Sequence, residues 1–124
     1  MKGLLNFIVS LLIFNTSYGQ ERMYDQTKIS SHFETTINNA KRGIKSPTGI
    51  IYYIEKDNRN LVAYKNDKMI WKTDIIAICG IPDVGSPEIR HIRLVKKTIS
   101  VTFGKHSYAT VDITNGKTQF LGSD

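Results

Sequence analysis

The sequence predicts a mainly β protein in which two antiparallel meanders form a sandwich or an open barrel. Two observations predict this fold class. From residue 47 onward, short runs of β-branched and aromatic residues are separated by turn residues. In the last third of the chain, apolar and polar residues alternate, as in strands that bury one face. A length of 124 residues fits one domain and excludes a multidomain enzyme.

Residues 1–19 have the pattern of a signal peptide. Lys2 precedes an apolar run over residues 4–14, and the small residues Ser17 and Gly19 stand where signal peptidase reads the chain before cleavage after Gly19. The apolar run is shorter than the roughly 20 residues that a membrane-spanning helix needs. We therefore expect a periplasmic or secreted protein that has no transmembrane span after cleavage.

Residues 20–46 form a polar N-terminal segment with two interpretations. Ile29, Phe33, Ile37 and Ala40 recur at helical spacing and predict an amphipathic helix that ends before Gly43. The alternative is a β segment over residues 33–37, because three of these residues are β-branched.

The β-rich domain is expected over residues 47–124. Its first meander has strands at residues 50–54, 61–64 and 69–71. Residues 75–79 are apolar at every position, which predicts a central strand covered on both faces, with Cys79 buried. On this interpretation, Ile78→Asp should unfold the protein.

The second half of the domain begins with a loop at residues 80–87, which contain two glycines and two prolines. Residues 88–97 are apolar enough to pair but strongly cationic, which predicts an edge strand protected against aggregation. Two strands follow at residues 99–103 and 108–113. Asn115-Gly116 predicts a type I′ turn after them.

A weak internal repeat relates the two meanders. Each copy has a strand, a second strand with a central alanine, a turn with a lysine and a third strand that ends on an aromatic residue; the alanines, Ala63 and Ala109, are 46 positions apart. Over residues 50–121 the chain resembles blades of β-propellers, in particular those of pyrroloquinoline-quinone-dependent dehydrogenases. The resemblance implies meander units that pack on one another, on the helix or on a second subunit. It implies no quinone site, because a propeller needs about four to eight blades.

Signatures of catalysis, metal binding and nucleotide binding are missing from the sequence. His32, His91 and His106 do not have zinc-ligand spacing, and the glycines do not have the spacing of a phosphate-binding loop. We therefore expect no metal and no cofactor. His106, Ser107 and Asp112 have the residue types of a nucleophilic triad, so a small hydrolase that uses them or His91 is kept as an alternative.

Candidate binding residues come from charge and aromatic content. The formal net charge is +6, which is modest for a nucleic-acid-binding protein, so we expect a protein or another anionic partner in the cell envelope. The function expected is that of an exported, non-enzymatic binding module, with an inhibitor or immunity-type protein as an alternative and a homo-oligomer as one way to bury surface. The candidate residues are the basic Arg90, His91, Arg93, Lys96, Lys97 and Lys105 and the aromatic Tyr52 and Tyr53.

Overall fold

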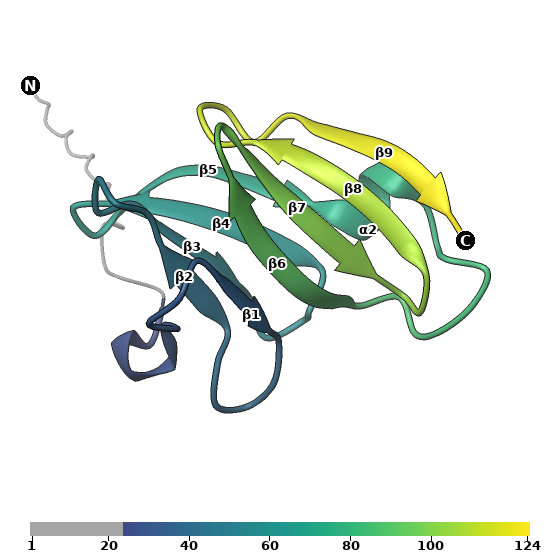
Figure 1. The fold of residues 1–124 in the computed structure, drawn as a ribbon, viewed down its shortest axis with the longest axis horizontal. Helices are drawn as coiled ribbons and strands as arrows, with labels where there is room; N and C mark the ends of the chain where they lie inside the picture. Colours follow the sequence, from purple (N-terminus) through teal and green to yellow (C-terminus); the bar gives the residue numbers. More distant parts are fainter. Residues whose placement is uncertain (1–23) are drawn as a thin grey trace, which may run out of the picture.

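The computed structural model describes residues 24–124, so the predicted signal peptide lies outside the described residues. The fold class is confirmed: two antiparallel sheets pack face to face and do not close into a barrel (Figure 1). The elements in chain order are the 3-10 turn η2 (Gln26–Lys28), β1 (Glu34–Thr36), β2 (Gly43–Lys45), β3 (Ile51–Ile54), β4 (Asn60–Lys65), β5 (Lys68–Asp74), α2 (Ile75–Cys79), β6 (Ile89–Val95), β7 (Thr98–Phe103), β8 (Ser107–Asp112) and β9 (Thr118–Ser123).

The four-stranded sheet has the order β2-β3-β4-β5, with every neighbouring pair antiparallel, so the first predicted meander is confirmed. A tight turn joins β4 to β5 at Asn66 and Asp67. Both residues have positive φ, 52° and 64°, which is typical of a type I′ turn and matches the right-handed twist of the strands.

The five-stranded sheet has the order β1-β6-β7-β8-β9. The strands predicted at residues 99–103 and 108–113 are confirmed as β7 and β8, but the prediction of an edge strand at residues 88–97 is wrong. β6 lies between β7 and the short strand β1, which pairs Glu34 with Arg93 and Thr36 with His91. A three-residue strand therefore covers the cationic strand, and the sequence did not reveal it as a neighbour.

The turn before β9 also differs from the prediction. Only Gly116 of the Asn115-Gly116 pair has positive φ, so the turn is not of type I′. The ring of Trp71 lies against Gly116, where a Cβ atom would come within 2.7 Å of the ring, and the indole Nε1 donates to the Ile113 carbonyl at 2.9 Å. This contact between the two sheets sets the path of the turn.

The predicted N-terminal helix is wrong, and the alternative β segment is the better description. β1 contains the β-branched Thr35 and Thr36, and the Ile37 amide continues its pairing by donating to the Arg90 carbonyl at 2.8 Å. The Asn38 side chain then accepts from the amides of Ala40 and Lys41 and turns the chain toward β2.

Residues 75–79 form the short helix α2, so the prediction of a central strand there is wrong. Asp74 caps the helix by accepting from the Ala77 amide at 2.9 Å, and Gly80, with φ of 94°, ends it. Ile75 and Ile76 are buried, but Ile78 is 56% exposed, so the expectation that Ile78→Asp unfolds the protein no longer holds. Cys79 is half-buried, and burial raises the pKa of its thiol.

Apolar side chains form two separate clusters. The inner core fills the space between the sheets, with members from both: Ile44, Tyr52, Ile54, Leu61, Ala63, Trp71, Ile75, Ile76, Ile89, Ile92, Ile99, Val101, Phe103, Ala109 and Val111. The outer cluster lies on the opposite face of the four-stranded sheet, where Tyr24 and Ile29 of the N-terminal segment pack against Ile51, Tyr53, Val62 and Tyr64.

The two copies of the internal repeat have matching registers. Ala63 lies opposite Tyr52 on one side and Trp71 on the other, and Ala109 lies opposite Val101 and Phe120. Both alanines are fully buried in the inner core. The copies therefore form equivalent three-stranded units, one in each sheet, and their relation to propeller blades stays a prediction.

Candidate functional site: a basic pocket between the sheets

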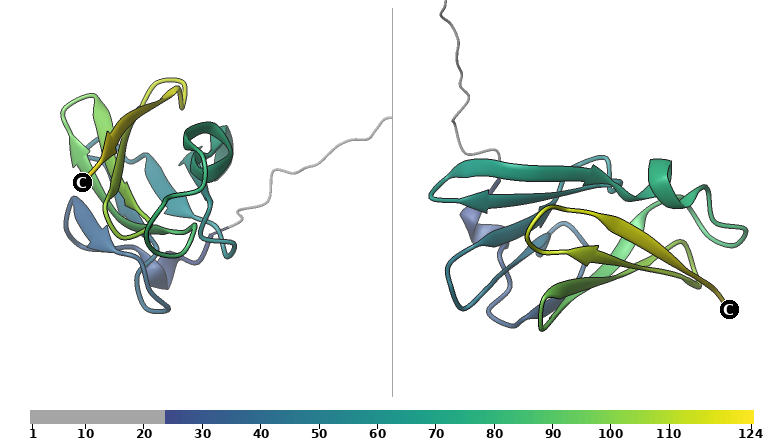
Figure 2. Two further views of the ribbon diagram at one scale, coloured as in Figure 1. Left: turned by 90° about the vertical axis from the view of Figure 1, so that its right-hand side faces the viewer. Right: turned by 90° about the horizontal axis from the view of Figure 1, so that it is seen from above.

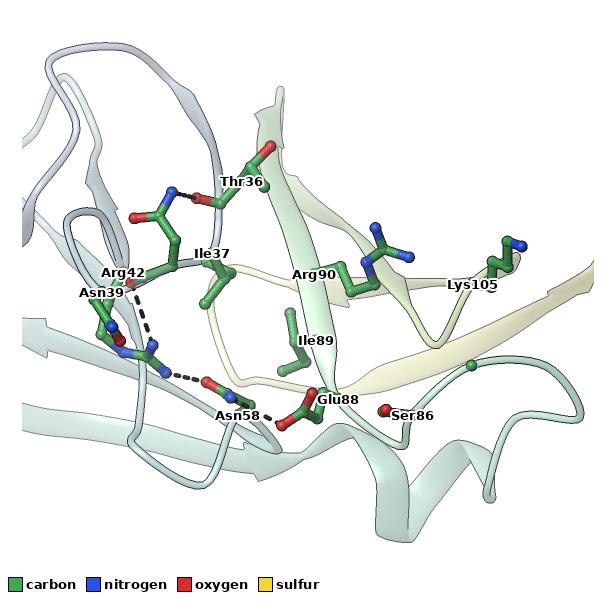
Figure 3. Close-up of a pocket in the computed structure, with 12 residues that line it drawn as sticks. Thr36, Ile37, Asn39, Arg42, Asn58, Ser86, Glu88, Ile89, Arg90 and Lys105 are labelled. Carbon is green, nitrogen blue, oxygen red and sulfur yellow. Dashed lines mark hydrogen bonds between the residues drawn. The ribbon is translucent and has the colours of Figure 1, made fainter.

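The predicted binding residues separate into two groups. Arg90 and Lys105 line one pocket, whereas His91, Arg93, Lys96 and Lys97 are not among its lining residues. We call this hollow of about 480 Å³ the basic pocket (Figure 3). Its lining residues are Thr36, Ile37, Asn38, Asn39, Arg42, Asn58, Gly85, Ser86, Glu88, Ile89, Arg90 and Lys105.

The remaining basic candidates are held by other contacts or lie elsewhere. His91 approaches Glu34 across the strand pair, with 3.0 Å between Nε2 and Oε1, and its Nδ1 is 3.3 Å from the Thr36 hydroxyl oxygen. Lys96 and Lys97 occupy the turn between β6 and β7, where Lys96 has a φ of 58°. The structure therefore does not combine the cationic stretch into one site.

Tyr52 and Tyr53 lie on opposite faces of the sheet as expected, but neither forms an exposed aromatic surface. Tyr52 is 0% exposed in the inner core, and Tyr53 is buried beneath the Tyr24 ring, with 5.8 Å between the ring centroids. The structure therefore does not present them as an exposed aromatic surface, and their role as binding residues stays a prediction. Both faces of the four-stranded sheet are covered, as the continuous apolar run over residues 50–54 would suggest.

Arg42 is the buried cation of the basic pocket. The residue is 9% exposed, and its guanidinium donates to the carbonyls of Ile54 at 3.1 Å and Glu55 at 2.7 Å. A third, longer bond of 3.4 Å goes to the Asn38 carbonyl. These bonds join the loop before β2 to the end of β3, so Arg42 fixes one wall of the pocket.

Asn58 connects this arginine to Glu88, the only carboxylate that the described part of the chain contributes to the lining. The amide oxygen of Asn58 accepts from Arg42, and its nitrogen donates to Glu88 at 3.1 Å. The Asn58 carbonyl accepts from the Ile89 amide at 2.7 Å. Asn58 has a φ of 60°, a conformation in which asparagine is enriched, so the residue type suits this junction of the two sheets.

Arg90 extends from a β-bulge in β6. Ile89 pairs with Phe103 and His91 pairs with Thr102, so Arg90 is the extra residue of the strand. Bulges redirect side chains, and here the bulge directs Arg90 to the pocket while Ile89 and Ile92 stay in the inner core. The guanidinium makes one long bond of 3.4 Å to the Gly104 carbonyl.

Lys105 is positioned by close packing of two loops at the end of the molecule that also holds α2 and the C-terminus (Figure 2). A Cβ atom on Gly85 would come within 2.5 Å of the Lys105 amide nitrogen, so a glycine is required at this approach. The Lys105 amide donates to the Val84 carbonyl at 2.8 Å, and the Gly104 amide donates to the Glu88 carbonyl at 2.9 Å. These contacts hold the turn between β7 and β8 against residues 80–88.

The charges of the basic pocket are unbalanced. Three cationic side chains, Arg42, Arg90 and Lys105, face the single carboxylate of Glu88. Within residues 24–124, the ion pairs join other residues: Arg59 with Asp74, Lys72 with Glu55 and His91 with Glu34. The pocket therefore favours a ligand with negative charge.

A larger hollow on the outer face of the four-stranded sheet lacks this imbalance. It has a volume of about 810 Å³, and its acidic residues are Asp25, Glu55 and Asp57. Equal numbers of basic residues, Lys28, Arg42 and Lys56, line the same hollow. Because its acidic and basic residues are equal in number, this hollow does not favour a ligand of either charge.

The residues of the hydrolase alternative do not form a triad in the structure. The Ser107 hydroxyl is 2.8 Å from that of Ser123, in a residue that is 3% exposed, and Asp112 lies at the opposite end of β8. The amide and hydroxyl of Thr114 donate to Asp112, and these bonds lower the pKa of the carboxyl. The three residue types are thus present without the geometry that a nucleophile and its base need.

The described residues show neither a cluster of metal ligands nor a membrane-spanning helix. Among residues 24–124, no three His, Cys, Asp or Glu side chains gather as metal ligands would. In the same part of the chain, no helix has the length and apolar character needed to cross a bilayer.

Sequence reasoning missed several residues of the basic pocket, above all Arg42, Asn58 and Glu88. In the sequence, Gly43 directly after Arg42 predicts the end of a helix. In the structure Gly43 lies in β2, where a Cβ atom would come within 2.8 Å of the Tyr52 carbonyl oxygen. The requirement for glycine is a close strand approach, which sequence spacing alone does not separate from a helix end.

Comparisons with protein-family models, with curated proteins and with solved structures find no match to this chain.

Proposed function

We propose that the protein is an exported, non-enzymatic binding module of the periplasm or extracellular space, and that the basic pocket holds its partner. The observation that carries the proposal is the convergence of Arg42, Arg90 and Lys105 around a hollow with one carboxylate. Export is supported by the signal-peptide pattern of residues 1–19. An anionic group is favoured as the bound moiety because it would neutralise the surplus positive charge.

The shape of the site favours a small bound group. A hollow of about 480 Å³ has the size of small-molecule sites, which run from roughly 300 to 1,000 Å³. An inhibitor or immunity-type protein would instead use a broad surface with aromatic anchors. The tyrosines that sequence reasoning offered for such a surface, Tyr52 and Tyr53, are buried.

The test compares two double variants with the unmodified protein, each immobilised and exposed to an envelope extract of the producing organism. Arg90→Ala/Lys105→Ala removes two charges from the pocket. Arg93→Ala/Lys97→Ala removes two charges from the same part of the chain without altering the lining. Bound material is eluted and identified by mass spectrometry.

The unmodified protein and the Arg93→Ala/Lys97→Ala variant should retain the same anionic component, and the pocket variant should lose it. The melting temperatures of all three proteins establish that they are folded. Equal retention by the pocket variant, or equal loss by both variants, would contradict the proposal.

A further inference from the structure

The polar side chains of the basic pocket differ in how many hydrogen bonds they make within the protein. Arg42 and Asn58 come from the four-stranded sheet, and hydrogen bonds join them to Glu88, which directly precedes β6 (Figure 3). Arg90 and Lys105 extend from the five-stranded sheet. Arg90 makes one long bond, and within the described residues the Lys105 ammonium group makes none. The positive charge available to a ligand is therefore concentrated at Arg90 and Lys105.

Further polar groups along the lining are suited to alcohols. The Asn39 amide, the Ser86 hydroxyl and the second carboxylate oxygen of Glu88 line the pocket, and over residues 24–124 they have no hydrogen-bond partner. A hydroxyl group both donates and accepts, so it can pair with each of these groups. A fully deprotonated oxyanion such as sulfate has no hydroxyl group that could donate to the acceptors among them.

The composition of the lining excludes other ligand classes. Among residues 24–124, no aromatic side chain lines the basic pocket, so this lining offers a nucleobase or another aromatic ring no stacking surface. A zwitterion would leave the surplus of positive charge uncompensated. Ile37 and Ile89 supply a small apolar wall, which suits the C–H face of a sugar ring.

We infer that the basic pocket binds a sugar acid, a hydroxylated carboxylate of monosaccharide or disaccharide size; this inference rests on the proposed function. The carboxylate lies at Arg90 and Lys105. The Arg90 guanidinium presents paired donors that match the two oxygens of a carboxylate, and Lys105 adds a second charge. The hydroxyl groups lie toward Asn39, Ser86 and Glu88.

The experiment is isothermal titration calorimetry of the purified protein with D-glucuronate, D-galacturonate and D-gluconate. D-Glucose lacks the carboxylate, acetate lacks the hydroxyl groups, and inorganic phosphate is an oxyanion without carbon hydroxyls. We expect at least one sugar acid to bind ten times or more tightly than glucose, acetate and phosphate. Arg90→Ala and Lys105→Ala should each weaken that binding about tenfold, which is typical for loss of a charged hydrogen bond. Lys97→Ala should leave it unchanged.

Three outcomes would overturn the inference. The first is binding of no sugar acid more tightly than acetate or phosphate. The second is glucose binding as tight as that of the acids, and the third is unchanged affinity in both pocket variants. If any of these occurs while the double variant Arg90→Ala/Lys105→Ala still loses the envelope component, the ligand class is wrong and the proposed function stands. Retention of that component by the double variant would instead contradict the proposed function.

Discussion

The two sheets bury their faces differently. The four-stranded sheet is covered on both sides, by the inner core and by the outer cluster under Tyr24 and Ile29. The five-stranded sheet contributes residues only to the inner core and none to the outer cluster. Along its strands β7 and β8, buried and partly exposed positions alternate. The difference shows that the N-terminal segment contributes as a cover for one sheet, in addition to the strands β1 and β2.

The same comparison explains where the basic pocket forms. Arg42 and Asn58 come from the ends of the four-stranded sheet, whereas Arg90 and Lys105 come from the five-stranded one. Neither sheet provides the site alone. The inner core that holds the sheets together therefore also holds the pocket in shape.

The largest expected effect is in the inner core. Leu61 is fully buried there, and Leu61→Ala should lower the free energy of unfolding by about 2–5 kcal/mol, because lost burial adds to the cost of a cavity. Urea denaturation measures the change. Ile78→Ala, at an exposed position, should shift stability by less than about 0.5 kcal/mol. Equal effects of the two changes would show that residue 61 does not face a core.

The second effect separates the two sheets. Tyr24→Ala should cost about 2 kcal/mol, because the ring packs on Tyr53 and Tyr64 and its hydroxyl donates to Asp67 at 2.9 Å. Thr110→Val, on the outer face of the five-stranded sheet, should change stability by less than about 0.5 kcal/mol. Amide hydrogen exchange should be faster in β3 and β4 of Tyr24→Ala than in the unmodified protein. An unchanged exchange rate would show that the N-terminal segment does not stabilise the four-stranded sheet.

A pH titration sharpens the account of the outer cluster. Burial, and then the charges of Glu55 and of Tyr24 and Tyr53, raise the pKa of Tyr64 to about 12. Because the folded value lies above the unfolded value of about 10, this contribution to stability is complete below pH 10 and is lost as the pH rises toward 12.

The measurement is urea denaturation at pH 9 and pH 11 for the unmodified protein and Tyr64→Phe. The unmodified protein should lose about 1 kcal/mol more than the variant over this range. Equal losses in the two proteins would show that Tyr64 titrates normally in the folded state.

The smallest effect concerns a hydroxyl in the inner core. The Tyr52 oxygen is buried and has no hydrogen-bond partner within the described residues. Tyr52→Phe removes an unsatisfied polar group while keeping the ring beside Trp71, so stability should stay equal or rise by up to about 1 kcal/mol. A thermal melt measures this, and a clear fall in melting temperature would mean that the hydroxyl is hydrogen-bonded.

Strand patterns in the sequence predicted most of the fold. Alternation of apolar and polar residues predicted the strands β7 and β8, and the aromatic and β-branched runs predicted β3, β4 and β5. The errors lie in short apolar segments. Residues 75–79 suit a buried strand or a buried helix turn equally, and only the flanking Asp74 cap and Gly80 favour the helix. Ile29, Phe33 and Ile37 have helical spacing but lie in different segments: Ile29 forms an isolated bridge with Gly43, and Phe33 and Ile37 flank the strand β1.

The basic pocket was only partly predictable, for a different physical reason. Net positive charge identified Arg90 and Lys105 as candidates. Arg93 and Lys97 carry the same charge in the same stretch, and only the bulge at Arg90 and the turn at Lys105 separate pocket residues from the others. Asn58 and Glu88 were missed because their roles depend on the packing of distant segments, which no local pattern encodes.

The most direct test of the central claim, that the basic pocket between the sheets binds a sugar acid, is amide chemical-shift mapping by NMR as D-glucuronate, D-galacturonate and D-gluconate are added in separate titrations. The account predicts shifts that cluster at Asn58, Ser86, Arg90 and Lys105, with Lys96 and Lys97 unaffected. Absence of shifts, or shifts concentrated at Lys96 and Lys97, would contradict it.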